Sequence, residues 1–188
     1  MYDFADSETG VNYSELAETG IELVNHLRVL SRPETRELLD RHRRDGETFR
    51  SHQIPAQNQR AVLGQLRSNY LIEPAEIDSG NVKDWTPTDR AVEMIDIVDE
   101  HQCYITDASA DSLILIGARV WMLPQDPDVW WTTSDIDVDI HPRELGTLHS
   151  AGLVERAIDT RSGYSSVWRT STRLHDIATV VWEVLSDE

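Results

Sequence analysis

Residues 145–155, with the sequence LGTLHSAGLVE, are the stretch that decides the fold. Leu145 and Leu148 have the spacing of one face of a helix, and Gly152 follows where helices commonly end. Apolar Leu153 and Val154, directly after the glycine, are typical of the start of a strand. The stretch therefore predicts a helix that passes through a glycine into a strand.

The same spacing occurs a second time in the chain. Five residues recur at a displacement of 82 positions, so that Leu63, Leu66, Leu71, Ile72 and Glu73 correspond to Leu145, Leu148, Leu153, Val154 and Glu155. After one inserted residue in a turn, Trp85 and Arg90 correspond to Trp168 and Arg173. An internal repeat of this length predicts two copies of one domain.

Both copies predict the order helix, helix, helix, strand, strand, helix. In the first copy we expect helices at residues 34–44, 48–53 and 55–69, a hairpin at 71–85, and a helix capped by Thr88. In the second copy we expect a helix at 108–122, a short helix after Thr133, a helix at 142–151, a hairpin at 153–170 and a helix at 172–185.

This order resembles the winged helix-turn-helix domain, and residues 145–155 together with Trp168-Arg169-Thr170 carry the resemblance. Where the second copy has Ala151-Gly152, the first has Asn69-Tyr70, and asparagine is the usual substitute for glycine in the left-handed conformation. The implied fold is mainly α with small β-hairpins (α+β), as two winged helix-turn-helix domains in tandem. Residues 1–30 would form an acidic lead and an amphipathic helix, residues 31–104 the first domain and residues 105–188 the second.

The charge of the chain is unusual in its composition. The formal net charge is -17, and of the 17 basic residues only Lys83 is a lysine. Scarce lysine with abundant aspartate resembles the proteins of halophiles that accumulate salt, especially haloarchaea, in which an acidic surface stays hydrated in molar KCl. We therefore expect a halophilic archaeal source, and the acidic total does not exclude a nucleic acid as partner.

Local charge favours such a partner. Residues 28–67 hold nine arginines against five acids, and residues 140–175 hold five arginines against three acids. Residues 107–139, between these two regions, hold seven acids against one arginine. Both regions contain the helices that the resemblance would place in the major groove of DNA, and arginine is suited to phosphate contacts.

The candidate DNA-binding residues lie on these helices and on the hairpins. Glutamine and asparagine pair with adenine and arginine with guanine, whereas cations on a hairpin contact phosphate. The expected residues are Gln57, Asn58, Arg60, Arg67 and Lys83 in the first copy, and His141, Arg143, Arg161 and Arg169 in the second. An alternative interpretation has polar residues solvating a helix and arginines pairing with nearby acids, for example Arg36 with Asp40.

An enzymatic function finds little support. Asp135-Ile136-Asp137-Val138-Asp139 lacks the glycine and glutamate of an EF-hand loop. Ser134 to Asp137 resembles the metal-binding strand of small nucleotidyltransferases, but the Gly-Ser pair of that family is missing upstream. The repeat instead places this stretch in a short helix capped by Thr133 or Ser134. We expect no catalysis, no metal and no cofactor.

The sequence thus predicts a sequence-specific, double-stranded DNA-binding transcriptional regulator. The alternative is a noncatalytic protein adaptor of tandem winged-helix type, from a chromosome-segregation or transcription complex. No segment is apolar enough to cross a membrane, so we expect a cytoplasmic protein. Apolar residues between Leu16 and Leu30 form an amphipathic segment that would pack on its own chain or join two copies in a homodimer.

Overall fold

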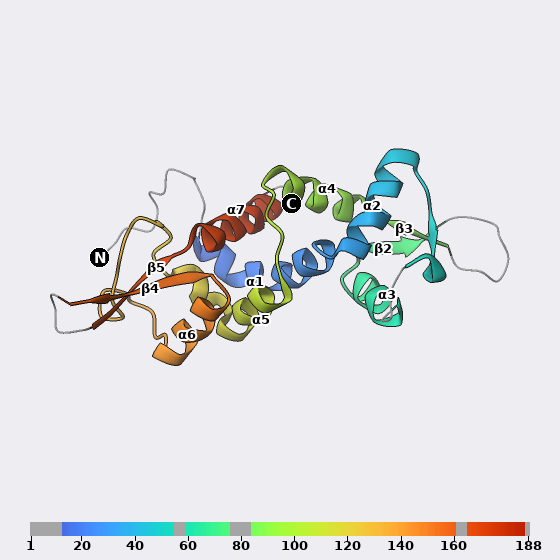
Figure 1. Ribbon diagram of the computed structural model, residues 1–188. Coiled ribbons are helices and arrows are strands. Elements are labelled where there is room, and N and C mark those ends of the chain that lie inside the picture. The colour runs from blue at the N-terminus through green and yellow to red at the C-terminus, as the bar shows by residue number, and fades with distance from the viewer. Residues whose placement is uncertain (1–12, 55–58, 76–83, 161–164, 187–188) are drawn as a thin grey trace. The chain divides into compact units, whose positions relative to one another are not determined.

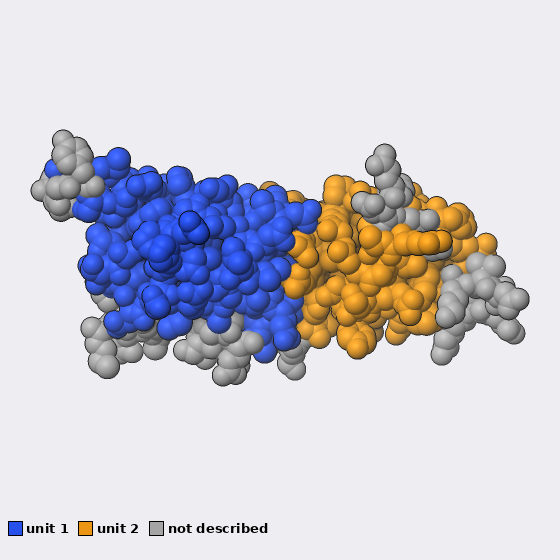
Figure 2. Space-filling model, turned by 90° about the horizontal axis from the view of Figure 1, so that it is seen from below, with its two compact units in different colours: residues 1–24, 105–188 blue, residues 25–104 orange. Residues whose placement is uncertain are grey.

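The computed structural model describes residues 13–54, 59–75, 84–160 and 165–186. Within them the chain is mainly helical with small antiparallel sheets (Figure 1), which confirms the α+β class predicted from the sequence. The chain divides into two compact units (Figure 2): residues 1–24 with 105–188 form unit 1, and residues 25–104 form unit 2. Helix α1, Tyr13–Leu30, begins in unit 1 and ends in unit 2.

Unit 2 continues from α1 with the elements α2 (Pro33–Asp45), β1 (Phe49–Arg50), the 3-10 helix η1 (Ser51–Gln53), α3 (Gln59–Ser68), β2 (Ile72–Pro74), β3 (Asp84–Pro87) and α4 (Asp89–Glu100). The three strands form one antiparallel sheet in the order β1-β3-β2. Phe49 lies opposite Trp85 and is buried. The prediction of a helix at 48–53 is therefore wrong for Phe49 and Arg50, which form strand β1, while Ser51–Gln53 form a 3-10 helix.

Unit 1 contains α5 (Asp107–Ile116), the 3-10 helix η2 (Gly117–Met122), α6 (Pro142–Ser150), β4 (Val154–Asp159), β5 (Ser165–Thr170) and α7 (Thr172–Ser186). β4 and β5 form an antiparallel hairpin in which Arg156 lies opposite Trp168 and Glu155 opposite Arg169. Trp131 forms an additional antiparallel bridge with Trp168, with both N···O distances at 2.8 Å.

Two expectations for unit 1 are corrected. The helix predicted at 108–122 is α-helical only to Ile116, because Gly117 has φ 68° and ψ -158° and the chain continues as a 3-10 helix. The short helix after Thr133 is absent among the described residues 132–140, and neither Thr133 nor Ser134 caps a helix there. A turn forms instead, because the Asp135 carboxylate accepts from the backbone N and the Oγ1 of Thr132, at 2.7 and 2.8 Å.

The sequence repeat corresponds to repeated backbone hydrogen bonds. Leu71 N donates to Leu66 O at 2.9 Å, and the equivalent Leu153 N donates to Leu148 O at the same distance. After the hairpin, Thr88 N donates to Leu71 O and Ser171 N donates to Leu153 O, both at 3.1 Å. In both units the third helix therefore joins the hairpin, and the hairpin joins the last helix, in the same way.

The left-handed residue between the third helix and the hairpin is Gly152 in unit 1, with φ 72°, and Tyr70 in unit 2, with φ 55°. The expectation that Asn69 would take this conformation is wrong. The Asn69 side chain donates to Gln65 O at 2.6 Å at the end of the helix, and the turn falls one residue later. Tyr70 is 80% exposed, so little packing favours tyrosine there.

Apolar side chains from every α-helix form the cores. Of the predicted apolar face of α4, Ala91, Ile95 and Val98 are buried and Val92 is half-buried. Thr88 caps this helix by accepting from Ala91 N at 3.3 Å. Leu23, Val24, Leu27 and Leu30 of α1 are also buried, so the amphipathic segment packs on its own chain. No helix in the described part of the chain is both long and apolar enough to cross a membrane.

The tryptophans and the cysteine contribute to this packing. Trp85 and Trp168 occupy equivalent places and are buried, as the repeat predicts. Trp121 and Trp131 are buried as well, whereas Trp130 is 43% exposed. Cys103 is buried, as expected for a small apolar residue.

Candidate nucleic-acid interface

Helix α6 has a strongly stabilised first turn. His141 is its N-cap: the His141 Nδ1 accepts from Arg143 N at 3.1 Å, and the Glu144 carboxylate accepts from His141 N at 2.7 Å. This reciprocal pair is a capping box, with histidine in the place usually taken by serine or threonine. His141, predicted to contact DNA, thus has a capping role in the structure.

An ion pair fixes the same turn to the preceding 3-10 helix. The Arg119 Nη2 lies 2.6 Å from Glu144 Oε1, and the Arg119 Nη1 donates to Asp139 O at 2.7 Å. The hydrogen bond from Arg119 and that from the His141 backbone hold the pKa of Glu144 below its usual value, because both favour the carboxylate. Glu144 in turn raises the pKa of Arg119.

Arg143 and Arg60 occupy similar places in the two units. Arg143 is the second residue of α6, Arg60 is the second residue of α3 as described, and both are exposed. Among the described residues, neither guanidinium forms an ion pair or a hydrogen bond. Both arginines are available to an anionic partner.

Arg67 and Arg169 are placed differently from these two. The Arg67 guanidinium lies over the Trp85 ring, 5.0 Å from its centroid. The Arg169 Nη2 forms an ion pair with Glu155 at 2.7 Å, and its guanidinium lies 4.8 Å from the centroid of Trp130. Since Glu155 neutralises part of its charge, Arg169 is a weaker candidate for phosphate contact than the sequence suggests. Gln57, Asn58, Lys83 and Arg161 lie outside the described residues.

Much of the positive charge of unit 2 is neutralised locally. Arg36 forms an ion pair with Asp99 at 2.6 Å rather than with Asp40, the partner suggested by helical spacing. Arg43 pairs with Asp96 and Asp99 of α4 and with Asp40 of its own helix. Arg41 pairs with Glu37, and Arg50 pairs with Asp84. The pairs of Arg36 and Arg43 with α4 link α2 to α4, and the pair of Arg50 with Asp84 links β1 to β3.

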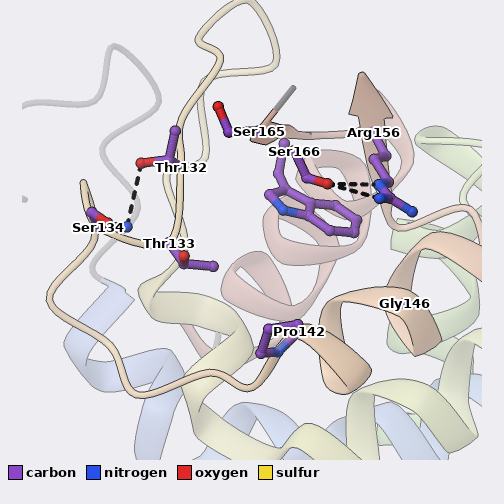
Figure 3. A pocket seen from close by; sticks show the side chains of 9 residues that line it. Thr132, Thr133, Ser134, Pro142, Gly146, Arg156, Ser165 and Ser166 are labelled. Atoms are coloured by element: carbon purple, nitrogen blue, oxygen red, sulfur yellow. Dashed lines mark hydrogen bonds between the residues drawn. The ribbon is translucent and has the colours of Figure 1, made fainter. Parts of the chain in front are cut away.

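A pocket of about 560 Å³ lies beside the start of α6 (Figure 3). Five of its lining residues carry hydroxyl groups, and we call it the hydroxyl pocket: Thr132, Thr133, Ser134, Ser165 and Ser166. The other lining residues are Pro142 and Gly146 of α6 and Arg156 and Trp168 of the hairpin. Figure 3 shows the loop residues on one side, Ser166 and Arg156 on the other, and Pro142 below.

Arg156 is the site residue that sequence reasoning missed. It lies in the basic region 140–175, in which the positions of Arg161 in the turn and of Arg169 near the end of the hairpin predicted those two arginines instead. The strand register puts Arg156 opposite Trp168, and therefore on the other face of the hairpin from Glu155 and Arg169. Side chains alternate between the two faces of a strand, so the pairing of the two strands, once known, distinguishes Arg156 from Arg169.

Comparison with protein families, with curated proteins and with solved structures finds no match for this chain. The observations that bear on function are those of the site itself. They are two arginines at the starts of equivalent helices, for which the described part of the chain provides no ion-pair partner, and a third arginine beside a pocket rich in hydroxyl groups.

Proposed function

We propose that the chain is a tandem winged-helix protein that binds double-stranded DNA as a transcriptional regulator. Support for the winged-helix assignment comes from the repeated order of helix, short pairing segment, helix, hairpin and helix, with equivalent hydrogen bonds at each junction. Phe49 and Trp131 are equivalent in the repeat, and they pair with the equivalent Trp85 and Trp168.

One observation carries the proposal for DNA. Arg60 and Arg143, in the first turns of α3 and α6, have no acidic partner among the described residues, in a chain with twice as many acids as bases. In helix-turn-helix proteins the N-terminal residues of the recognition helix contact base edges. Arginine there forms two hydrogen bonds with guanine, each such pair contributing roughly 1–3 kcal/mol.

The test is selection from random-sequence duplex DNA by the full chain, in roughly 1–2 M KCl so that the acidic protein stays folded. The affinity of single variants is then measured on the selected site. We expect Arg60→Ala and Arg143→Ala each to weaken binding about tenfold or more, with an unchanged free energy of unfolding. Arg41→Ala, whose guanidinium pairs with Glu37, is the matched control and should bind almost as the wild type does.

Equal affinity of all three variants, or no selected site from a folded sample, would refute DNA binding. A protein adaptor is then the second candidate. The observation that favours it is the exposure of large apolar side chains in unit 1, including Leu115 at 67% and Trp130. Under that function we expect the exposed side chains, not the arginines, to determine affinity for a partner.

A further inference from the structure

The hydroxyl pocket has the chemistry of an anion site. None of the nine described residues that line it is acidic, although the chain contains 34 acids. Its one charged side chain is Arg156, and its polar groups are hydroxyls, which donate hydrogen bonds as readily as they accept them. Arginine with serine and threonine hydroxyls is the combination that proteins use to bind phosphate.

The exposed Arg156 side chain is oriented by contacts with the neighbouring strand. Its Nε and Nη2 both donate to Ser166 Oγ, at 3.1 and 2.7 Å (Figure 3), and its guanidinium lies 5.5 Å from the centroid of the Trp168 ring. Within the described residues Arg156 has no carboxylate partner, and its Nη1 has no acceptor. The guanidinium is therefore oriented by Ser166 and Trp168 without being neutralised by a described carboxylate, and such preorganisation lowers the entropy lost when an anion binds.

The hydroxyls differ in their availability. Thr132 is already occupied, because it donates to Asp135 and accepts from Ser134 N. Ser166 only accepts from Arg156, so its own hydroxyl hydrogen can be donated to a ligand. Thr133 and Ser134 are exposed at the pocket. The first backbone N–H of α6 belongs to Arg143, and it already donates to His141 Nδ1. The hydrogen-bond donors for a ligand are therefore side chains.

Gly146 adds a separate observation. It lies in the middle of α6, where glycine is less favourable than alanine, and a Cβ there would meet no atom within 4 Å. Nothing within the described chain requires this residue to lack a side chain. Since Gly146 lines the hydroxyl pocket, the missing side chain leaves room for a ligand.

We propose that the hydroxyl pocket binds a phosphate group at Arg156 and Ser166, and that the hydroxyls of Thr133 and Ser134, on the opposite side of the pocket, contact the rest of the same ligand. The volume lies within the range of small-molecule sites and suits a ligand of nucleotide size. The phosphate belongs either to a small organic phosphate or to the backbone of DNA. The inference goes beyond DNA binding, because a small phosphate compound can occupy the pocket whether or not the chain binds a duplex.

Calorimetric titration of the full chain in roughly 1 M KCl tests the proposal, with adenosine monophosphate as the probe and adenosine as its phosphate-free control. We expect saturable binding of the monophosphate and much weaker binding of adenosine. Arg156→Gln should weaken binding about tenfold or more, the cost of a lost charge-assisted hydrogen bond. Arg173→Gln removes the same charge from α7 of the same unit, outside the pocket, and should leave binding within about twofold.

A second pair of variants separates binding from folding. Gly146→Ala should weaken binding while raising the thermal midpoint, because alanine favours the helix but its methyl group occupies ligand space. Gly64→Ala, at the equivalent position of α3 and also without a neighbouring atom within 4 Å, should raise the midpoint and leave binding unchanged. A loss of binding with higher stability cannot come from unfolding.

A duplex added in competition distinguishes the sources of the phosphate. If DNA displaces adenosine monophosphate, the pocket takes a backbone phosphate, and if both bind together it takes a small organic phosphate. Monophosphate binding without any duplex binding would leave the pocket proposal standing and refute DNA binding. The pocket proposal is overturned if Arg156→Gln weakens the binding of neither adenosine monophosphate nor the duplex.

Discussion

The substitution Gly152→Ala tests the junction between α6 and the hairpin. Gly152 has φ 72°, and a Cβ added there would meet no atom within 4 Å, so the change involves no steric clash. The cost is conformational: a left-handed residue with a side chain loses about 1–2 kcal/mol. Alanine also restricts the unfolded chain, which recovers about 0.4–1 kcal/mol. We therefore expect the free energy of unfolding to fall by about 0.5–1 kcal/mol.

Gly64→Ala is the matched control with the opposite sign. The same atom is added in equally open space, but in the interior of α3, where alanine favours the helix by about 0.5–1 kcal/mol. The two variants should therefore differ in free energy of unfolding by roughly 1–2 kcal/mol. The equivalent Tyr70, with φ 55°, shows that this place accepts a side chain, so Gly152→Ala should still fold.

Urea unfolding followed by circular dichroism, in roughly 1–2 M KCl, measures both changes. The slope of the free energy against urea should be the same for both variants and the wild type, since neither change alters the area exposed on unfolding. A Gly152→Ala protein as stable as the wild type, or a Gly64→Ala protein less stable than it, would contradict the reasoning.

Three further predictions concern stability and solution conditions. Thr88→Ala should lower the free energy of unfolding by about 1 kcal/mol, because the α4 cap is lost, whereas Thr88→Ser should keep most of the cap's contribution. Chemical denaturation measures both variants, and equal losses of stability would argue against capping. Glu144 has a lowered pKa, so its contribution is present above the ordinary carboxyl pKa of about 4.3 and is lost as the pH falls through the lower folded value. Glu144→Gln should therefore remove part of the acid dependence seen in urea midpoints, and an unchanged dependence would exclude this carboxylate as a cause. Raising KCl from about 0.1 to 2 M should raise the wild-type midpoint, because screening within about 3 Å reduces repulsion in a chain of net charge -17; a falling midpoint would contradict a halophilic surface.

The sequence predicts most of the α-helices and the paired strands well, because their signals are local; the exception among the helices is 108–122, where the α-helix ends at Ile116. Thr88 and the apolar spacing after it define α4, and Pro142 and Gly152 bracket α6 closely. The repeat adds the equivalence of Trp85 and Trp168, whose burial no single window would show. Regular periodicity with clear start and stop residues is the common property of these elements.

The errors occur where tertiary contacts outweigh local preference. Phe49 is buried by pairing with a strand more than thirty residues later, which nothing in residues 48–53 reveals. The turn after Trp131 forms because the Asp135 carboxylate accepts two hydrogen bonds from Thr132. The sequence predicted a short helix there instead, with Thr133 or Ser134 as its N-cap. Both segments are short, and short segments take the conformation that their neighbours allow.

The candidate site was predicted only in part, because tertiary contacts also determine which arginines are neutralised. Arg60 and Arg143 follow from their places at helix starts, whereas ion pairs such as that of Arg169 with Glu155 require the strand register. Arg156 was overlooked because its importance comes from a pocket assembled from a loop, a helix and a hairpin. A charge count over a window cannot distinguish a neutralised arginine from an available one.

Helix α1 has a consequence for how this chain can be divided. Its residues up to Val24 belong to unit 1 and those from Asn25 to unit 2, so no cut that separates the units leaves this helix whole. A fragment of either unit would carry a severed helix with unsatisfied backbone groups at its new end. Deletion of either copy would therefore also truncate this helix, which contributes the buried Leu23 and Val24 to one unit and Leu27 and Leu30 to the other.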